Sequence, residues 1–473
     1  MRLLEVPRRR ASRSAPAPAR GAQRLAAAAL LPLALGVSAG CAPEALHPDV
    51  VLIAVDTLRA DHSSVHGYER DTTPQLEALA REGTRFEVAY SPMSITGAAI
   101  ASLFTGLHPA GHLVLDNGIA LSDAQESLAE MFRASGYQTA AIVSSFVLDA
   151  KFGFGQGFDH YDDDFDAESA SFVMEKWQGR ERVAAFDRRA DQTTDAAIRW
   201  LEAGRDRGRP CFLFVHYFDP HAPYLPPGAA ALRFTAPRGS EPLASQVARY
   251  DSEIAFADAQ IGRLLAALSA VGLDRTSIVV ATSDHGEGLM QRNYMTHGLF
   301  VYEEEVRVPL VVRWPDRVAA GRVVTAPVAL VDLAPTLVDL TGIELPRRRF
   351  DGASLAAGLL GEADFDETRA VFLQRKYFRG GLAEGKIPAI GRRFAVRQGG
   401  WKYIFGPAEG THELYDLAQD PGETTNRFHE VPELAERLRE QVERWRSAHP
   451  VALSRAEISA QDREALRALG YGD

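Results

Sequence analysis

Three stretches of the sequence hold side chains that could do chemistry. Thr96 stands between the irregular stretch Ser91–Ile95 and the run Ala98–Phe104, whose residues favour a helix. We expect Thr96 to cap this helix, and a cap could be its whole role. A hydroxyl there would also lie at the positive end of the helix dipole, which favours an alkoxide or a bound anion. Thr96 is therefore a candidate nucleophile.

The other two stretches are apolar runs that end in residues able to bind a metal ion. Val50–Val55 is followed by Asp56, and Ser277–Ser283 by Asp284 and His285. Such runs are typical of buried parallel strands, whose carboxyl ends meet at one edge of a sheet. We expect Asp56, Thr96, Asp284 and His285 to surround a divalent cation. This mixed oxygen and nitrogen shell favours manganese or zinc, with calcium or magnesium as alternatives.

From about Asp49 to its end, the chain resembles the sulfatase family of the alkaline phosphatase superfamily, because these motifs and several later ones occur in the family's order. The resemblance implies an α/β fold. A large, mostly parallel mixed sheet flanked by helices would fill a catalytic domain over residues 48–365. A small antiparallel sheet with a packing helix would follow over residues 366–473. The implied activity is hydrolysis of sulfuric or phosphoric esters.

The resemblance also implies two histidines that contact the substrate. His221 matches a substrate-binding histidine of the family, and His297 occupies the place of a lysine or histidine that touches the anionic group. Either could protonate the leaving alcohol, since imidazole titrates near neutral pH. Asp219 stands close to His221 and is a further candidate for substrate binding. Whether Asp219 and His221 hold a second ion stays open.

The sequence departs from the family at the nucleophile. Family sulfatases carry a cysteine or serine, converted to formylglycine, in the pattern Cys/Ser-x-Pro-x-Arg; here Thr96, Ala98 and Ile100 stand at its three defined places. Threonine cannot undergo that oxidation, so we expect no formylglycine and a covalent Thr96 ester instead. Thr57 likewise replaces a second aspartate that often follows Asp56 in the family.

The charges near these motifs narrow the substrate. No lysine lies in sequence beside the expected ligands or around His221 and His297, which argues against strong binding of a phosphate dianion. A monoanionic sulfate ester, phosphodiester or phosphonate monoester fits better, carried on a small molecule, a glycan or a lipid. Two alternatives remain: a transferase of phosphoethanolamine or phosphoglycerol groups, and an inactive binding protein with the same fold.

The first 40 residues have the composition of an export signal. Seven arginines and Glu5 accompany the apolar run Leu25–Val37, which is too short to span a membrane. Gly40-Cys41 resembles a bacterial lipoprotein site, although cleavage after Ala39 is an alternative. We expect an exported, periplasmic or cell-surface protein with a lipid anchor at Cys41. Loss of residues 1–40 would change the net charge from −11 to −17, and this negative charge argues against a nucleic-acid partner.

Other residues are expected to be structural. Cys211 lies in an apolar run, so we expect a buried thiol. Glu253 and Asp258 are expected on the solvated face of a helix over Val247–Leu268. The run of Glu303, Glu304 and Glu305 is expected at the surface, with Arg307 as its ion-pair partner.

Overall fold

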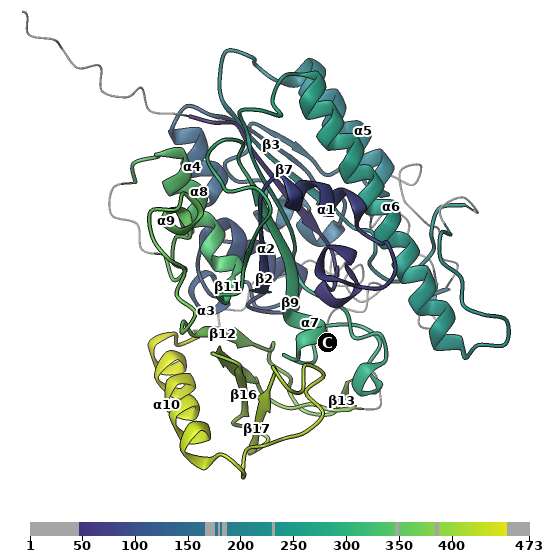
Figure 1. Ribbon diagram of the computed structural model, residues 1–473, viewed down its shortest axis with the longest axis vertical. Helices are drawn as coiled ribbons and strands as arrows, with labels where there is room; N and C mark the ends of the chain where they lie inside the picture. Colours follow the sequence, from purple (N-terminus) through teal and green to yellow (C-terminus); the bar gives the residue numbers. More distant parts are fainter. Residues whose placement is uncertain are drawn as a thin grey trace, which may run out of the picture. The chain divides into compact units, whose positions relative to one another are not determined.

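A large sheet forms the centre of the catalytic part (Figure 1). The computed structural model describes residues 47–165, 176–177, 180–181, 187–228, 232–345, 350–383 and 387–451, and within them nine strands form this sheet in the order β10-β2-β9-β8-β1-β7-β3-β4, with β11 paired to β2. The strands are β1 Val50–Val55, β2 Thr84–Tyr90, β3 Gln138–Ile142, β4 His160–Asp162, β7 Cys211–Tyr217, β8 Ile278–Ser283, β9 Arg307–Arg313, β10 Arg322–Val324 and β11 Val328–Ala329. Residues 1–40, expected to be an export signal, and Cys41 lie outside the described residues.

Neighbouring strands of this sheet run parallel, except that β9 is antiparallel to both β2 and β8. Ala45–Asp473 form one compact unit. The expected fold class, a large mostly parallel sheet with flanking helices, is therefore confirmed.

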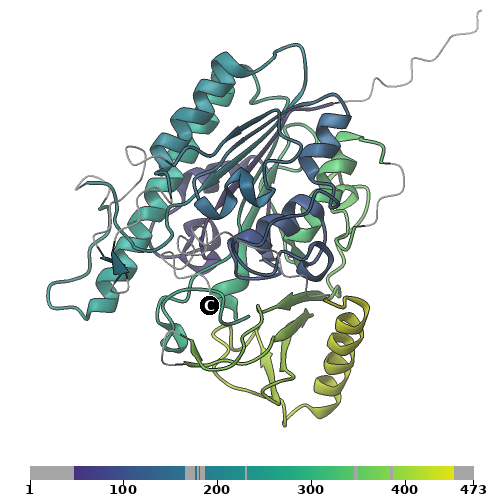
Figure 2. The same ribbon diagram turned by 180° about the vertical axis from the view of Figure 1, so that it is seen from behind.

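Both faces of the sheet are covered, which explains why its strands are apolar throughout. Alternate residues of β1 enter two separate cores: Val50, Leu52 and Ala54 on one face, and Val51, Ile53 and Val55 on the other. Helices α2 (Thr96–Thr105), α4 (Leu128–Ala134) and α8 (Leu333–Thr341) cover the first face, and α1 (Pro74–Arg81), α5 (Ala190–Arg199) and α6 (Pro242–Ala270) the second (Figures 1 and 2). Cys211 lies in the second core as a buried free thiol, as expected.

Helix α6 corrects one expectation. Glu253 and Asp258 are buried, not solvated. Asp258 accepts hydrogen bonds from the N–H groups of Gln75 and Leu76 at 2.8 and 3.0 Å, and so caps the start of α1. Glu253 accepts a hydrogen bond from the N–H of Leu225. Periodicity identified the apolar stripe of α6 but not the segments that cover its other face.

A second sheet follows in the chain. Strands β12 (Val371–Gln374), β15 (Phe394–Gln398), β16 (Trp401–Gly406) and β17 (Thr411–Asp416) pair antiparallel in this order. Helix α10 (Pro432–Ala448) packs on one face through Leu438, Val442 and Trp445, and the other face packs against residues of the catalytic part. The small C-terminal antiparallel sheet is thus confirmed, while a domain boundary between residues 365 and 366 stays a prediction.

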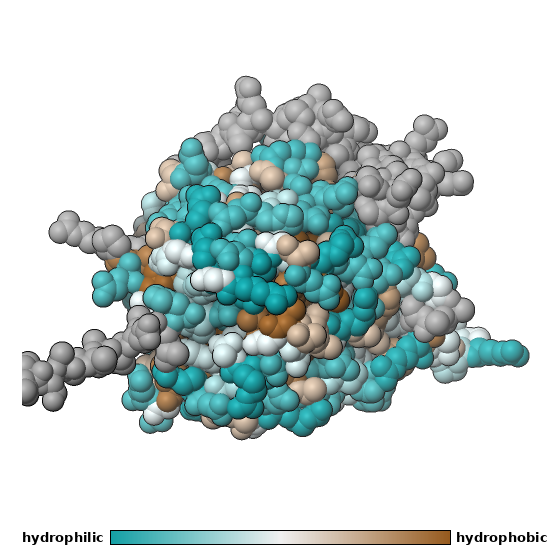
Figure 3. Space-filling model, turned by 90° about the horizontal axis from the view of Figure 1, so that it is seen from above, coloured by the Kyte–Doolittle hydropathy of each residue, from teal (hydrophilic) through white to brown (hydrophobic). Residues whose placement is uncertain are grey.

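The remaining elements are short. They include the helices α3 Pro109–His112, α7 Glu303–Val306 and α9 Ala356–Leu359. They also include two strand pairs, β5 Lys176–Trp177 with β6 Arg180–Glu181 and β13 Leu382–Ala383 with β14 Ile387–Pro388. Among the described residues, none of the helices combines the length and the apolar composition that a transmembrane span requires. On the face seen in Figure 3 the coloured residues are mostly hydrophilic, and the hydrophobic ones form small separate patches.

Candidate active site

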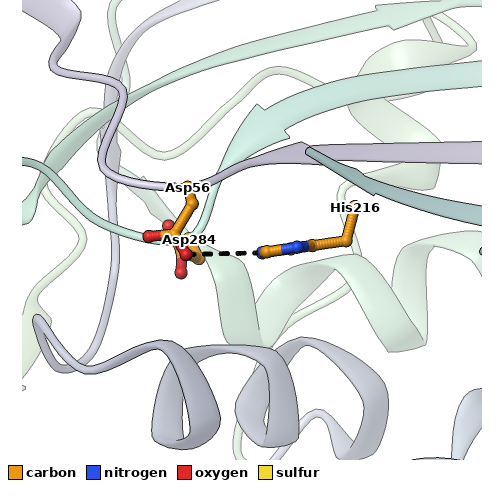
Figure 4. Close-up of side chains that lie close together, drawn as sticks. All are labelled: Asp56, His216 and Asp284. Atoms are coloured by element: carbon orange, nitrogen blue, oxygen red, sulfur yellow. Dashed lines mark ion pairs between the residues drawn. The ribbon is translucent and has the colours of Figure 1, made fainter. Parts of the chain in front are cut away.

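Asp56, His216 and Asp284 meet at the carboxyl ends of three adjacent strands. Strand β1 lies between β7 and β8, with Ala54 opposite His216 and Val55 opposite Ser283. Strand alternation directs His216 to the same face as Phe214, which α2 covers, and Asp56 and Asp284 continue this alternation just past their strands. Figure 4 shows the His216 ring pointing toward the two carboxyl groups.

Five polar atoms of this cluster are buried without hydrogen-bond partners among the described residues. They are both carboxylate oxygens of Asp56, Oδ2 of Asp284, and Nδ1 and Nε2 of His216. All three side chains are 0% exposed, and one ligand atom from each lies within 4.8 Å of the others. Buried polar atoms normally find a partner, because leaving them unpaired costs free energy. Two carboxylates and an imidazole so arranged fit a divalent cation.

Electrostatics support the same fit. Burial, and then the charges of Asp284 and Glu287, raise the pKa of Asp56 well above its usual value. Burial also raises the pKa of Asp284. Burial lowers the pKa of His216 to about 3, so its ring is neutral and offers a lone pair. A cation would stabilise both carboxylates in their ionised form.

Thr96 lies beside this cluster at the start of α2. It is the first residue of the helix, whereas Ile95 is the capping residue, so the expectation that Thr96 is the cap is wrong. Oγ1 of Thr96 lies 3.2 Å from Nε2 of His285. Because Nδ1 of His285 donates to the carbonyl of Gly286 at 2.9 Å, the lone pair of a neutral His285 ring is on Nε2.

His285 also borders the carboxylates. Its Nε2 is 3.5 Å from Oδ2 of Asp284 and 3.9 Å from Oδ1 of Asp56. Asp56, Thr96, Asp284 and His285, expected together from the sequence, are therefore close in space. Thr57, which takes the place of a second aspartate, has a left-handed backbone with φ 54° and donates its N–H to Oδ1 of Asp284 at 3.1 Å. Such strain costs about 1–3 kcal/mol and gathers at functional sites.

His221 and His297 form a contact next to the cluster. Nδ1 of each ring lies against a carbonyl oxygen, that of Ala222 at 2.7 Å for His221 and that of Ser94 at 3.1 Å for His297. A carbonyl only accepts, so each Nδ1 carries a proton. The two Nε2 atoms are 3.2 Å apart, and a hydrogen bond between them requires one further, shared proton. Burial opposes this charge, lowering the pKa of His221 to about 4 and that of His297 well below its usual value.

Asp219 follows β7 and contacts the first residue of α5, Ala190. Its Oδ2 accepts the N–H of Ala190 at 2.8 Å, and burial raises its pKa to about 6. This contact gives Asp219 a structural role, and its contact with a substrate stays a prediction. Among the described residues, the one group of three or more acidic, histidine or cysteine side chains close enough to share an ion is Asp56, His216 and Asp284.

The glutamates after Tyr302 were expected at the surface, but two of the three are buried, and Glu305 makes hydrogen bonds next to the site. Glu304 and Glu305 are buried. Oε2 of Glu305 accepts hydrogen bonds from the hydroxyl of Ser94 and the N–H of Gly298, each at 2.8 Å. It thereby joins the segment before Thr96 to the segment after His297. Arg307 pairs with Glu87 rather than with the glutamates, so that expectation was also wrong.

Three residues near the site were missed from the sequence. His216 lies near the end of the apolar run that begins at Cys211, and its alternation with Phe214 was a usable signal. Asn117 is buried, and its Oδ1 accepts the N–H of Gly97 at 2.8 Å, directly beside Thr96. Lys376 follows β12, and its charge contributes to lowering the pKa of His297. The argument that no lysine lies near the site is therefore corrected.

Comparisons with known proteins agree with this architecture. The profile of the sulfatase family matches residues 48–343, and that of the C-terminal part of N-sulphoglucosamine sulphohydrolase matches residues 295–448. The chain is 25% identical to an N-acetylglucosamine-6-O-sulfatase of Bacteroides thetaiotaomicron over 507 aligned residues, covering 84% of this chain and 86% of the relative. It is 27% identical to arylsulfatase A of Bos taurus, covering 86% and 88%.

A solved structure shows the same fold. The phosphonate monoester hydrolase of Agrobacterium radiobacter is 24% identical and superposes with a TM-score of 0.69, covering 88% of this chain and 98% of that one. Because the sulfatase profile covers more than half of the chain, the resemblance noted in the sequence is confirmed. The chain belongs to the sulfatase family, whose members are hydrolases of ester bonds.

Proposed function

We propose that this chain is a metal-dependent hydrolase that cleaves a monoanionic sulfate ester, phosphodiester or phosphonate monoester through a covalent Thr96 intermediate. The observation that carries the proposal is the position of the Thr96 hydroxyl. It lies at the N-terminus of α2, 3.2 Å from Nε2 of His285 and beside the buried carboxyl groups of Asp56 and Asp284. That environment favours an activated hydroxyl.

Asp56, His216, Asp284, His285 and Thr96 would hold the cation. Two imidazoles among five ligands favour manganese or zinc over calcium or magnesium, which prefer oxygen. When bound, the cation would lower the pKa of the Thr96 hydroxyl and stabilise negative charge on the ester oxygens.

The residues of the chain account for the other steps. The Thr96 hydroxyl releases its proton to solvent, and Oγ1 attacks the sulfur or phosphorus atom while the bond to the alcohol oxygen breaks on the opposite side. The proton shared by His221 and His297 passes to that oxygen, so a neutral alcohol leaves. An anionic substrate would offset the burial that otherwise opposes this proton. Water then attacks the sulfur or phosphorus atom and the bond to Oγ1 breaks; one proton of the water returns to Oγ1 and the other to the pair of His221 and His297.

The substrate class rests on relatives and on the identity of the nucleophile. Two relatives are named as a sulfatase of N-acetylglucosamine 6-sulfate groups and as an arylsulfatase, and a structural neighbour as a phosphonate monoester hydrolase. We propose a sulfated glycan or an aryl-like sulfate as the first candidate. Threonine in place of the formylglycine precursor keeps phosphodiesters and phosphonate monoesters as candidates too.

The test is mass spectrometry of the intact protein and its peptides after brief incubation with aryl sulfate, phosphodiester and phosphonate monoester substrates. An adduct of the transferred group on the Thr96 peptide is expected, with its mass identifying sulfur or phosphorus. Thr96→Ala is expected to lose the adduct and to lower kcat by on the order of a thousandfold or more. Thr96→Ser, which keeps the hydroxyl, is the matched control. Unchanged turnover by Thr96→Ala would overturn the mechanism.

We further propose export and lipid anchoring at Cys41, supported by the basic and apolar leader before it. The protein is expected in the membrane fraction of cells that secrete it, and Cys41→Ser is expected to release it. Equal membrane association of both forms would contradict an anchor at this residue.

A further inference from the structure

Lys376 follows β12 by two residues and forms an ion pair with Asp116. Its Nζ lies 3.2 Å from Oδ1 and 3.1 Å from Oδ2 of Asp116. The side chains of Lys376 and Asp116 are 16% and 30% exposed, so the pair is accessible from solvent. The chain has five lysines, Lys151, Lys176, Lys376, Lys386 and Lys402, and otherwise uses arginine as its cation.

Contacts on both sides fix this ion pair against the segment that carries Thr96. Just before Lys376, the N–H of Gln374 donates to the carbonyl of Pro92 at 2.9 Å. Just after Asp116, Oδ1 of Asn117 accepts the N–H of Gly97 at 2.8 Å. The pair is thus tied to the chain on both sides of Thr96 by short hydrogen bonds.

The backbone around Lys376 is also held. The N–H of Arg375 donates to the carbonyl of Arg393 at 2.8 Å, and its guanidinium donates to the carbonyl of Ile390 at 2.8 Å and to Glu409 at 3.0 Å. The N–H of Asn117 donates to Oδ1 of Asp116 at 3.0 Å. Lys376 therefore presents its charge from a fixed position.

Two further observations indicate what the ammonium group of Lys376 could bind. His297, one of the two histidines proposed to protonate the leaving alcohol, contacts the same segment before Thr96, because its Nδ1 lies 3.1 Å from the carbonyl oxygen of Ser94. An ammonium group has three N–H donors, and the two oxygens of Asp116 occupy two of them. The third can bind an oxygen of a substrate, and a stronger anion can displace Asp116 altogether.

We propose that Lys376, held by Asp116, is a specificity-determining residue that binds a second anionic group on the alcohol part of the substrate. This inference rests on the proposed function. It narrows the substrates to esters whose alcohol carries a carboxylate, or a second sulfate or phosphate, close to the ester oxygen. Asp116 would keep Lys376 neutralised until such a group arrives, which disfavours alcohols without one.

The experiment compares two aryl esters that differ by one charge, a 4-nitrophenyl and a 2-carboxy-4-nitrophenyl ester of the group that the enzyme transfers. We expect Lys376→Met to lower kcat/KM for the carboxylated ester at least tenfold more than for the plain ester. Lys376→Arg is expected to restore part of this difference. Arg379→Met, which removes an exposed charge three residues away, is the control and is expected to leave the ratio unchanged.

A reciprocal variant sharpens the test. Asp116→Asn is expected to raise kcat/KM for the carboxylated ester relative to the plain one, because Lys376 loses its competing partner. Equal effects of Lys376→Met on both esters, or an equal effect of Arg379→Met on the ratio, would overturn the inference. Failure of the proposed function is distinguishable, since the wild type would then turn over neither ester or would do so independently of Thr96.

Discussion

Asp56, His216 and Asp284 each cost the fold stability in the absence of a bound ion. Their side chains are fully buried and keep polar atoms without hydrogen-bond partners in the described part of the chain. Each such group costs about 1–3 kcal/mol. A bound cation would offset these costs together, which explains how the fold tolerates them.

The importance of His216 is testable on its own. We expect His216→Ala to weaken binding of zinc or manganese by at least about tenfold to a hundredfold, because the loss of a direct ligand should cost no less than the loss of a group that merely orients one. Titration calorimetry of the chelator-treated protein, with elemental analysis of metal content, measures this directly. His160→Ala, at an exposed histidine of the same sheet, is the control. Equal affinities of wild type and His216→Ala would remove His216 from the metal site.

The sequence predicted some of these residues and missed others for a physical reason. Asp56 and Asp284 follow uninterrupted apolar runs, so a charged side chain there stands out as the end of a buried strand. His216 lies inside such a run, and only the pairing of β7 with β1 shows which face it occupies. Lys376 is far from Thr96 in the sequence, and no local pattern indicates that the end of β12 lies against the segment before Thr96.

At the scale of elements, α6 shows the limit of reading periodicity. Its apolar stripe was predicted from spacing, but burial of its acidic residues depends on α1 and on the segment at Leu225, whose positions the helix itself does not encode. Asp258 binds two N–H groups at the start of α1, yet burial still raises its pKa to about 7. Desolvation therefore outweighs the hydrogen bonds.

This balance predicts a pH dependence of stability. The folded protein keeps a proton on Asp258 to a higher pH than the unfolded chain does, so the stability from this group is complete below about pH 4 and is lost as the pH rises through 7. Each unit of pKa difference corresponds to about 1.4 kcal/mol. The side chain of Asp258→Asn is neutral at every pH. In calorimetric scans, the Tm of the variant relative to that of the wild type is therefore expected to rise between pH 4 and pH 8. A constant difference over that range would contradict this account.

At the scale of the whole molecule, the C-terminal sheet is bound to the catalytic part by a buried ion pair as well as by apolar packing. Nζ of Lys402 on β16 lies 3.0 Å from Oε1 of Glu303 on α7 and 3.1 Å from Oε1 of Glu423, and its side chain is fully buried. The second sheet was predicted from its alternating strands, but this docking surface was not, because it joins residues about 100 positions apart.

We expect Lys402→Met to lower the free energy of unfolding by about 3–5 kcal/mol, because it leaves buried carboxylates without their cation. Urea denaturation measures the change. Lys151→Met, at a partly exposed pair with Asp149, is the control and should cost about 1 kcal/mol or less. Similar losses for the two variants would show that the Lys402 pair does not hold the sheet in place.

The alternation along β1, β7 and β8 has a last consequence. The same parity that sends Leu52, Phe214 and Val280 into one core also directs the proposed metal ligands toward α2. A strand that pairs one residue out of register turns every side chain to the opposite face. Such a chain would present Val55 to α2 in place of Asp56 and could not capture the ion. Metal binding would therefore stabilise only those molecules whose sheet has formed in the correct register.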